Sequence, residues 1–200
     1  MTEEPGNSRR RRFLTAITSI LGLAGAGTLA ASFVASMRPS ARARAAGAPV
    51  EVDISRLRER QMLVVAWRGK PVWIMRRSQQ MLDDLGTLRQ VLVDPDSEIA
   101  QQPVYAQNEF RSIRPDILVV LGVCTHLGCA PIKNFERGTA SGLSEDWLGG
   151  FFCPCHGSKF DLAGRVYKNV PAPTNLEVPP HSFLSDSRIV IGTGRGEGTA

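Results

Sequence analysis

Two stretches of sequence decide the fold of this 200-residue chain: Cys124-Thr125-His126-Leu127-Gly128-Cys129 and Cys153-Pro154-Cys155-His156-Gly157-Ser158. Together they hold all four cysteines and two of the three histidines. Thiolate and imidazole are the ligands that proteins use for zinc and for iron–sulfur clusters. Each stretch contains a Cys–His pair, spaced Cys-x-His in the first and Cys-x-x-His in the second. The sequence therefore predicts a metal centre held between two loops.

The two motifs resemble those of the Rieske proteins of quinol–cytochrome c oxidoreductase, the bc1 complex. The resemblance runs from about residue 50 to residue 191. Three further segments carry it: Trp67-Arg68-Gly69-Lys70-Pro71-Val72-Trp73-Ile74, Val119-Val120-Leu121-Gly122-Val123 and Pro171-Ala172-Pro173-Thr174-Asn175-Leu176-Glu177-Val178-Pro179-Pro180. It implies a mostly β fold, an antiparallel β-sandwich or partly open barrel with a cluster-binding subdomain at about residues 122–173.

The resemblance implies one Rieske-type [2Fe–2S] cluster per subunit. In that arrangement, two thiolates bind one iron and two neutral imidazoles bind the other. Cys124 and Cys153 are then the thiolate ligands, and His126 and His156 are the imidazole ligands. Two ferric ions, two sulfides and two thiolates sum to zero charge, whereas four thiolates leave a dianion. Reduction is therefore easier, and the potential rises to about −150 to +300 mV.

The same resemblance gives roles to the other polar residues of the two motifs. Cys129 and Cys155, one in each motif, are expected to form a disulfide that ties the loops together. Ser158 is expected to donate its hydroxyl to a bridging sulfide, which stabilises the reduced cluster and raises its potential.

The implied function is electron transfer, as a subunit of ubiquinol–cytochrome c reductase, a translocase. The chain is expected to take one electron from quinol bound to cytochrome b and pass it to cytochrome c1 within a dimeric complex. Each cluster imidazole keeps one nitrogen free to carry a proton, so electron uptake is linked to proton uptake. The resemblance makes His156 the ring that accepts the quinol hydrogen bond. The sequence alone does not distinguish it from His126.

Three other classes of protein use similar ligands. Zinc sites also use two cysteines and two histidines, but the 26 residues between these two pairs do not match the spacing of a zinc finger. Oxygenase components and small ferredoxins of the Rieske type lack the second cysteine pair. An anchored Rieske subunit of another periplasmic oxidoreductase, of the arsenite oxidase type, remains the alternative.

The charge distribution argues against nucleic acid as a partner. Residues 1–49 hold seven arginines and two glutamates, whereas residues 50–200 hold 17 basic and 17 acidic residues. A nucleic-acid-binding domain carries its basic excess on the folded domain. Here the whole excess lies in the N-terminal segment.

The N-terminal segment is predicted to be an export signal followed by an uncleaved anchor. Residues 14–37 carry no charge, and about 20 apolar residues suffice to cross a bilayer. The preceding Arg10-Arg11-Arg12-Phe13-Leu14 resembles a twin-arginine signal, which places residues 1–13 in the cytoplasm. Cleavage near Ala41-Arg42-Ala43 or Ala43-Arg44-Ala45 is the alternative. The expected topology is single-pass in the bacterial cell membrane, with the head in the periplasm, where a disulfide is stable.

The remaining segments have weaker patterns. Residues 38–49 are rich in Ala, Arg and Gly, which predicts a linker, and the resemblance makes it a hinge for the head. The head at residues 50–191 is expected to contain strands at 62–67, 71–75, 116–123, 151–152 and 188–191 and a short helix at 79–85, followed by a tail at 192–200. Residues 130–150 show no clear period and are expected to be an irregular excursion.

Three residues of the head depart from the family or stand outside its motifs. Phe160 stands where many bc1 Rieske proteins have Tyr, so a hydroxyl donor to a cysteine sulfur is missing. Val170 stands where Gly is common, ahead of the Pro171-Ala172-Pro173 stretch, which is expected to be a rigid flap over the cluster. His181 is expected to be structural or on the surface, since no cysteine lies near it in sequence.

Overall fold

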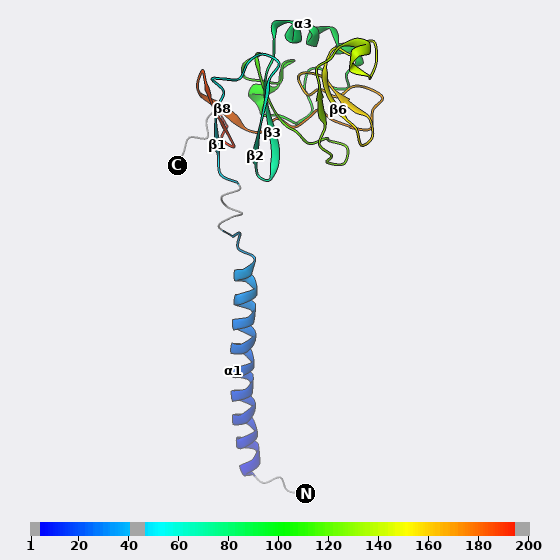
Figure 1. The fold of residues 1–200 in the computed structure, drawn as a ribbon. Coiled ribbons are helices and arrows are strands. Elements are labelled where there is room, and N and C mark those ends of the chain that lie inside the picture. Colours follow the sequence, from blue (N-terminus) through cyan, green and yellow to red (C-terminus); the bar gives the residue numbers. More distant parts are fainter. Residues whose placement is uncertain (1–4, 41–46, 195–200) are drawn as a thin grey trace. The chain divides into compact units, whose positions relative to one another are not determined.

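The computed structural model describes residues 5–40 and 47–194. The chain divides into two compact units, with the boundary between Ala45 and Ala46. The first unit is one long helix and the second is the β-rich head (Figure 1). The middle of the predicted linker, residues 41–46, and the last part of the predicted tail, residues 195–200, lie outside the described residues.

Helix α1 (Pro5–Ser36) contains the predicted anchor. Its part from Ser8 to Ser36 is long and apolar enough to cross a membrane. The hydroxyls inside it bond to carbonyls of the preceding turn, as in Thr18 Oγ1 to Leu14 O at 2.9 Å and Ser32 Oγ to Thr28 O at 2.9 Å. These bonds satisfy the hydroxyls in a bilayer, where water is absent. They explain how a stretch of only moderate hydrophobicity can serve as a span.

The helix extends beyond the predicted anchor at its N-terminal end. It starts at Pro5 and includes the whole arginine run. Pro is favoured in the first turn of a helix, and Arg is a good helix former, so the charged residues extend the helix without a break. The change in charge marks where the apolar stretch begins, and a helix need not begin there.

The described part of the head contains nine strands in three antiparallel sheets, with orders β1-β9-β8, β2-β3-β4 and β5-β6-β7. The strand bounds are β1 Val50–Asp53, β2 Met62–Trp67, β3 Lys70–Arg76, β4 Ile117–Leu121, β5 Ile132–Asn134, β6 Gly150–Cys153, β7 Ser158–Phe160, β8 His181–Ser185 and β9 Arg188–Ile191. The helical segments are α3 Gln79–Thr87, η1 Arg89–Val91, η2 Val104–Ala106 and η3 Gly138–Ser141. The predicted mostly β fold with open antiparallel sheets is confirmed.

The hairpin between β2 and β3 follows directly from its turn residues. Trp67 pairs with Lys70, so the loop consists of Arg68 and Gly69 alone. Both have positive φ, at 50° and 73°. Two successive residues with positive φ form the primed turn that matches the twist of paired strands.

In the middle sheet, β2-β3-β4, strand β4 and most of β3 are buried on both faces, and this positions the metal centre. On β4, Val119 and Leu121 face the core shared with the β1-β9-β8 sheet, whereas Leu118 and Val120 face a second core. The second core also contains Phe151 and both free cysteines. Burial on both faces explains why β4 is a continuous apolar run and not an alternating one. The end of β4 therefore delivers the first motif at the edge of the second core.

The sequence analysis missed four strands, and its view of residues 130–150 was partly wrong. That region contains β5 and η3. β5 and β7 have three residues each, which is too short for a period of two to be recognised. They are strands because they pair with β6, which is a tertiary contact.

His181 is a buried structural residue, in agreement with its predicted role. It is 0% exposed at the start of β8. Its backbone amide donates to the Tyr105 hydroxyl at 2.7 Å, and its Nδ1 lies 2.9 Å from the Pro179 carbonyl oxygen. Because a carbonyl only accepts, Nδ1 carries the proton. Nε2 is then an unprotonated nitrogen that is buried without a partner in the described part of the chain.

This environment predicts a loss of stability in acid. Burial lowers the pKa of His181 below its ordinary value. As the pH falls from about 6.5 towards the lower folded-state pKa, the unfolded chain binds a proton that the folded chain does not, so folding is disfavoured. We expect the melting temperature of the wild type to fall more steeply between pH 7 and pH 5 than that of His181→Phe. Thermal melts of both proteins at each pH check this, and equal slopes would contradict it.

Candidate metal centre

The two motifs form two loops with the same local structure. The first loop (residues 124–129) follows β4, and the second loop (residues 153–158) joins β6 to β7. In each loop, the glycine at the fifth position donates its amide to the carbonyl of the first cysteine, at 3.0 Å from Gly128 and 2.9 Å from Gly157. The φ angles of these glycines are 82° and 81°. Glycine adopts this conformation without strain, so both sequences close into the same tight turn.

A disulfide between Cys129 and Cys155 ties the two loops together, with a Cα–Cα distance of 6.7 Å. The predicted pairing is therefore confirmed. Cys124 and Cys153 are free and are 3% and 2% exposed. The sulfurs of Cys129, Cys153 and Cys155 lie within 4.8 Å of one another. Since two of these three sulfurs are bonded to each other, only Cys153 remains available as a metal ligand.

The surroundings of the two free thiols fit a cationic group. Burial raises the pKa of the Cys153 thiol, and the neighbouring Cys124 raises it further. Two thiolates at this place would be unfavourable without a positive charge beside them. A bound metal supplies that charge and deprotonates coordinating thiols outright. This donor set therefore fits an iron centre.

The two histidines of the motifs lie against each other. The ring centroids of His126 and His156 are 4.8 Å apart, with the ring planes at 87°. Nδ1 of His126 is buried, and no residue in the described part of the chain bonds to it. Buried nitrogen atoms are nearly always bonded, so an orphan nitrogen in the same loop as the free thiol of Cys124 fits a metal ligand. His126 is half-buried, whereas His156 is exposed.

Residues 170–174 (the proline segment) lie further along the chain than both loops and are bonded to both of them. Thr125 Oγ1 donates to the Thr174 carbonyl oxygen at 2.7 Å, and the Ala172 amide donates to Ser158 Oγ at 3.0 Å. Ser158 is 0% exposed. Because its oxygen accepts from Ala172, its own proton is left to be donated elsewhere. This arrangement agrees with the predicted bond from Ser158 to a sulfide.

Sequence reasoning missed the part played by Thr125. The residue stands between a cysteine and a histidine, where its side chain has no evident role in the sequence. Its partner Thr174 lies 49 residues further along the chain. No local pattern indicates a contact over that distance.

The Phe160 side chain lies on the same sheet face as the free thiol of the second loop. Cys153 pairs with Ser158, and Phe151 pairs with Phe160, so these four side chains share one face of the β6-β7 hairpin. All four are buried. Phe160 also belongs to the core that contains Cys124 and Cys153. The register therefore points the Phe160 ring into the core beside the metal centre.

Because of this placement, the effect of having Phe in place of Tyr at residue 160 can be tested. We expect Phe160→Tyr to add a hydroxyl donor to a cysteine sulfur, which favours the extra negative charge of the reduced cluster. A neutral hydrogen bond contributes about 0.5–1.5 kcal/mol, and a tenfold change in a one-electron equilibrium is about 59 mV. The potential should therefore rise by roughly 20–60 mV in a redox titration.

Phe152→Tyr is the matched control, because Phe152 lies on the opposite face of β6. It should leave the potential unchanged. A potential that is unchanged or lower in Phe160→Tyr would refute the hydrogen bond.

Comparison with known proteins agrees with this geometry. A family model described as "Rieske [2Fe-2S] domain" matches residues 49–180, and one described as "Ubiquitinol-cytochrome C reductase Fe-S subunit TAT signal" matches residues 1–40. The ubiquinol-cytochrome c reductase iron-sulfur subunit of Allochromatium vinosum is 57% identical over 196 residues, which is 98% of this chain and 94% of the relative. The subunit of the same name from Blastochloris viridis is 39% identical over 96% of this chain and 98% of its own length.

Among solved structures, a chain described as "Hyperthermophilic respiratory Complex III" is similar, with 26% identity, a TM-score of 0.46 and coverage of 88% of this chain and 97% of its own. The family assignment rests on the sequence matches, which cover nearly the whole chain at high identity. The predicted resemblance and the predicted twin-arginine signal are both confirmed. The chain belongs to the Rieske family, whose domain binds one [2Fe–2S] cluster, and within it to the iron–sulfur subunits of ubiquinol–cytochrome c reductase.

Proposed function

We propose that this chain is the mobile electron carrier of a bacterial ubiquinol–cytochrome c reductase. It accepts one electron from quinol at cytochrome b and delivers it to cytochrome c1, and the whole complex acts as a translocase. The observation that carries the proposal is the pair of disulfide-tied loops, which bring two free buried thiols and two histidine rings together. The near full-length similarity to the named subunits supports it.

In this proposal, Cys124 and Cys153 hold one iron of the cluster, and His126 and His156 hold the other. The bound cluster supplies one-electron transfer at the raised potential of a mixed-ligand centre. The orphan Nδ1 of His126 supports this assignment, because a buried nitrogen without a protein partner in the described part of the chain is free to bind a metal. The other ring nitrogen is then free to carry a proton.

His156 is proposed as the residue that meets quinol and accepts its hydrogen bond. The exposure of its ring supports this, since a substrate can reach it without a rearrangement, whereas His126 is half-buried. A neutral imidazole nitrogen accepts a proton near physiological pH, so one residue can take the proton while the cluster takes the electron. His126 is the second proton-carrying ring.

The proposed location is the bacterial cell membrane, with α1 as the anchor, the N-terminus in the cytoplasm and the head in the periplasm. The disulfide between the loops supports this orientation, because disulfides persist in oxidising compartments. Residues 38–49 are proposed as the hinge that lets the head move between cytochrome b and cytochrome c1 in a dimeric complex.

The proposal is tested on membranes from cells that express the full chain and from cells that lack it. We expect a redox-poised sample to show the EPR signal of a reduced mixed-ligand [2Fe–2S] centre, and quinol-dependent reduction of cytochrome c to require the chain. A colourless protein that contains zinc would contradict the proposal. So would quinol oxidation at the same rate without the chain.

A further inference from the structure

Three arginines lie inside the head, where the proposed electron transfer gives them no role. Arg77, Arg111 and Arg165 are 2%, 0% and 0% exposed. Of the carboxylates described in the structure, Asp161 is buried with them and forms an ion pair with Arg165 at 2.7 Å. Burial lowers the pKa of Arg77 to about 9 and that of Arg111 to about 10, so both remain charged at neutral pH. A buried charge is costly, and its presence requires bonds that only a guanidinium can make.

Each of the three arginines sends at least one of its bonds to one tight turn, residues 161–165 (the arginine-held turn), which follows β7. The Asp161 carboxylate closes the turn from inside, accepting the amides of Ala163 at 2.9 Å and Arg165 at 2.8 Å through one oxygen. Its other oxygen accepts from the Arg165 guanidinium at 2.7 Å. The turn therefore has a fixed shape with all of its polar groups on one side engaged.

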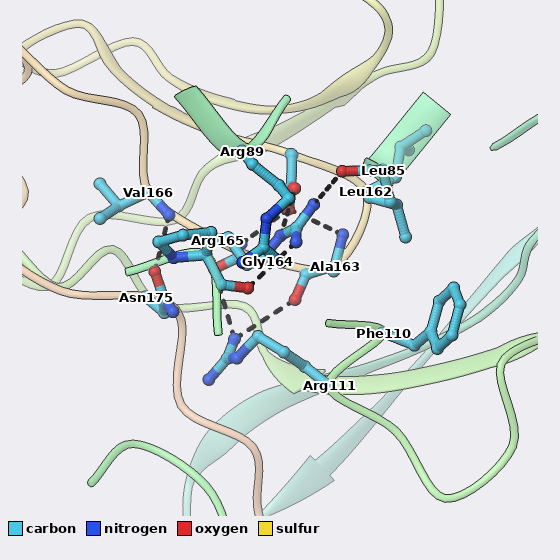
Figure 2. A network of polar contacts seen from close by, with 12 residues as sticks. Leu85, Arg89, Phe110, Arg111, Leu162, Ala163, Gly164, Arg165, Val166 and Asn175 are labelled. Atoms are coloured by element: carbon cyan, nitrogen blue, oxygen red, sulfur yellow. Dashed lines mark hydrogen bonds and ion pairs between the residues drawn. The ribbon is translucent and has the colours of Figure 1, made fainter. Parts of the chain in front are cut away.

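The carbonyl groups in the middle of the turn are held from outside by the other two arginines. Arg77 Nη1 donates to the Leu162 oxygen at 3.2 Å. Arg111 Nη1 donates to the oxygens of Ala163 and Gly164, both at 3.3 Å. Figure 2 shows Arg111 reaching the turn from the opposite side to Arg165. Three successive carbonyls are thus bound by two planar guanidinium groups.

Gly164 forms a hydrogen bond between the arginine-held turn and the residues that directly follow the proline segment. Its oxygen also accepts the Leu176 amide at 2.8 Å. A Cβ on Gly164 would lie 3.3 Å from both Arg111 Nη1 and Leu176 Cβ, and its φ of 73° favours glycine. Beside it, the Val166 amide donates to Asn175 Oδ1 at 2.9 Å. Residues 175 and 176 are therefore fixed directly against the arginine-held turn.

Residues 175 and 176 directly follow the proline segment, which is bonded to both loops of the metal centre. The contacts form a continuous series from Arg111 through Gly164 and Leu176 to Thr174, which accepts the Thr125 hydroxyl, and to Ala172, which donates to Ser158. A movement of the arginine-held turn would therefore shift the segment that orients the Ser158 hydroxyl.

We propose that Arg111 is a positioning residue for the redox centre, which holds the proline segment in place over the two loops through the arginine-held turn. The inference rests on the proposed function, because it takes the two loops as the site of the cluster. Arg111 acts through geometry: its planar group reaches two carbonyls and, through Nη2, the Gln102 side chain at 2.9 Å. An ammonium on a lysine stem would carry the same charge but could not hold all three acceptors at once.

The test uses the full-length protein in detergent, as wild type and as Arg111→Met and Arg111→Lys. We expect both variants to keep two irons per chain. Arg111→Met should show a broadened EPR line shape and an equilibrium constant for reduction lowered roughly tenfold, which is about 59 mV for a one-electron couple. Lysine should restore less than half of the shift. Arg188→Met is the matched control, because this arginine is exposed on β9, where it meets Glu51, and should leave both readouts unchanged.

Gln102→Met keeps the proposal testable if the Arg111 variants do not fold. It removes the acceptor of Arg111 Nη2, together with the bonds that the Gln102 amide donates to the Ser97 and Ile99 oxygens, and should give a smaller shift in the same direction. A wild-type potential and line shape in Arg111→Met, or in Gln102→Met where only that variant folds, would overturn the proposal. A wild-type potential and line shape in Arg111→Lys would also overturn the proposal, since Arg111 would then act through its charge and not through its geometry. A wild-type protein without two irons would instead refute the proposed function.

Discussion

Replacing Cys129 and Cys155 together by serine is expected to make the metal centre labile. The disulfide joins two cysteines that are 26 residues apart in sequence, one in each loop, and each loop carries proposed ligands. In the chain-entropy account, a cross-link over this span contributes about 3–4 kcal/mol to folding stability. Without it, the direct covalent tie between the loops is lost, and each loop keeps the bonds within its own turn and its bond to the proline segment. We therefore expect a lower melting temperature and release of iron under conditions in which the wild type retains it.

Iron content and the EPR amplitude, followed over time in a chelator, measure this lability. The wild type in air, treated with a thiol-alkylating reagent without reductant, is the control for the bond itself and should show neither cysteine modified. Unchanged iron retention in the double serine variant would mean that the proline segment alone holds the loops. If the reagent alkylates both cysteines in the wild type without reductant, the disulfide does not form.

The elements predicted from the sequence are those with a strong local cause. β2 and β9 begin and end where the sequence analysis placed them, and the turn at Arg68-Gly69 has the two positive φ angles that such a hairpin needs. β4 is a continuous apolar run because both of its faces are buried. The disulfide follows from the ligand pattern, since the resemblance uses only one cysteine from each loop. In each case, a few neighbouring residues determine the outcome.

The parts that sequence reasoning missed depend on contacts between distant residues. In a sequence, Arg77 and Arg111 resemble ordinary surface charges, because their acceptors are carbonyls that any residue carries. Arg77 meets Leu162 across 85 residues and Arg111 meets Gly164 across 53. These two arginines find their acceptors in the arginine-held turn only after the head has folded. The bonds that hold the candidate site in place are therefore less visible in the sequence than the ligands themselves.

Replacing His156 by alanine is expected to abolish the EPR signal of the mixed-ligand centre and to reduce quinol oxidation to background. The residue is exposed, and the backbone of its loop is held by Gly157, the disulfide and Ser158, so the side chain is not needed for packing. Its loss removes one of two proposed imidazole ligands and the proposed hydrogen-bond acceptor for quinol. The folded head should survive, and the iron and labile sulfide should be lost or reduced in amount.

The decisive comparison is between folding and metal content in the same sample. Lys133→Ala is the matched control, because Lys133 is exposed on β5 in the sheet that also contains β6 and β7. It should keep two irons, two sulfides and the wild-type signal. A His156→Ala protein that retains the full iron and sulfide content with an unchanged signal would show that the ligand assignment is wrong. Loss of the signal together with a wild-type melting curve of the head would place His156 at the iron, because the ring contact of this exposed side chain is with His126, the other proposed imidazole ligand.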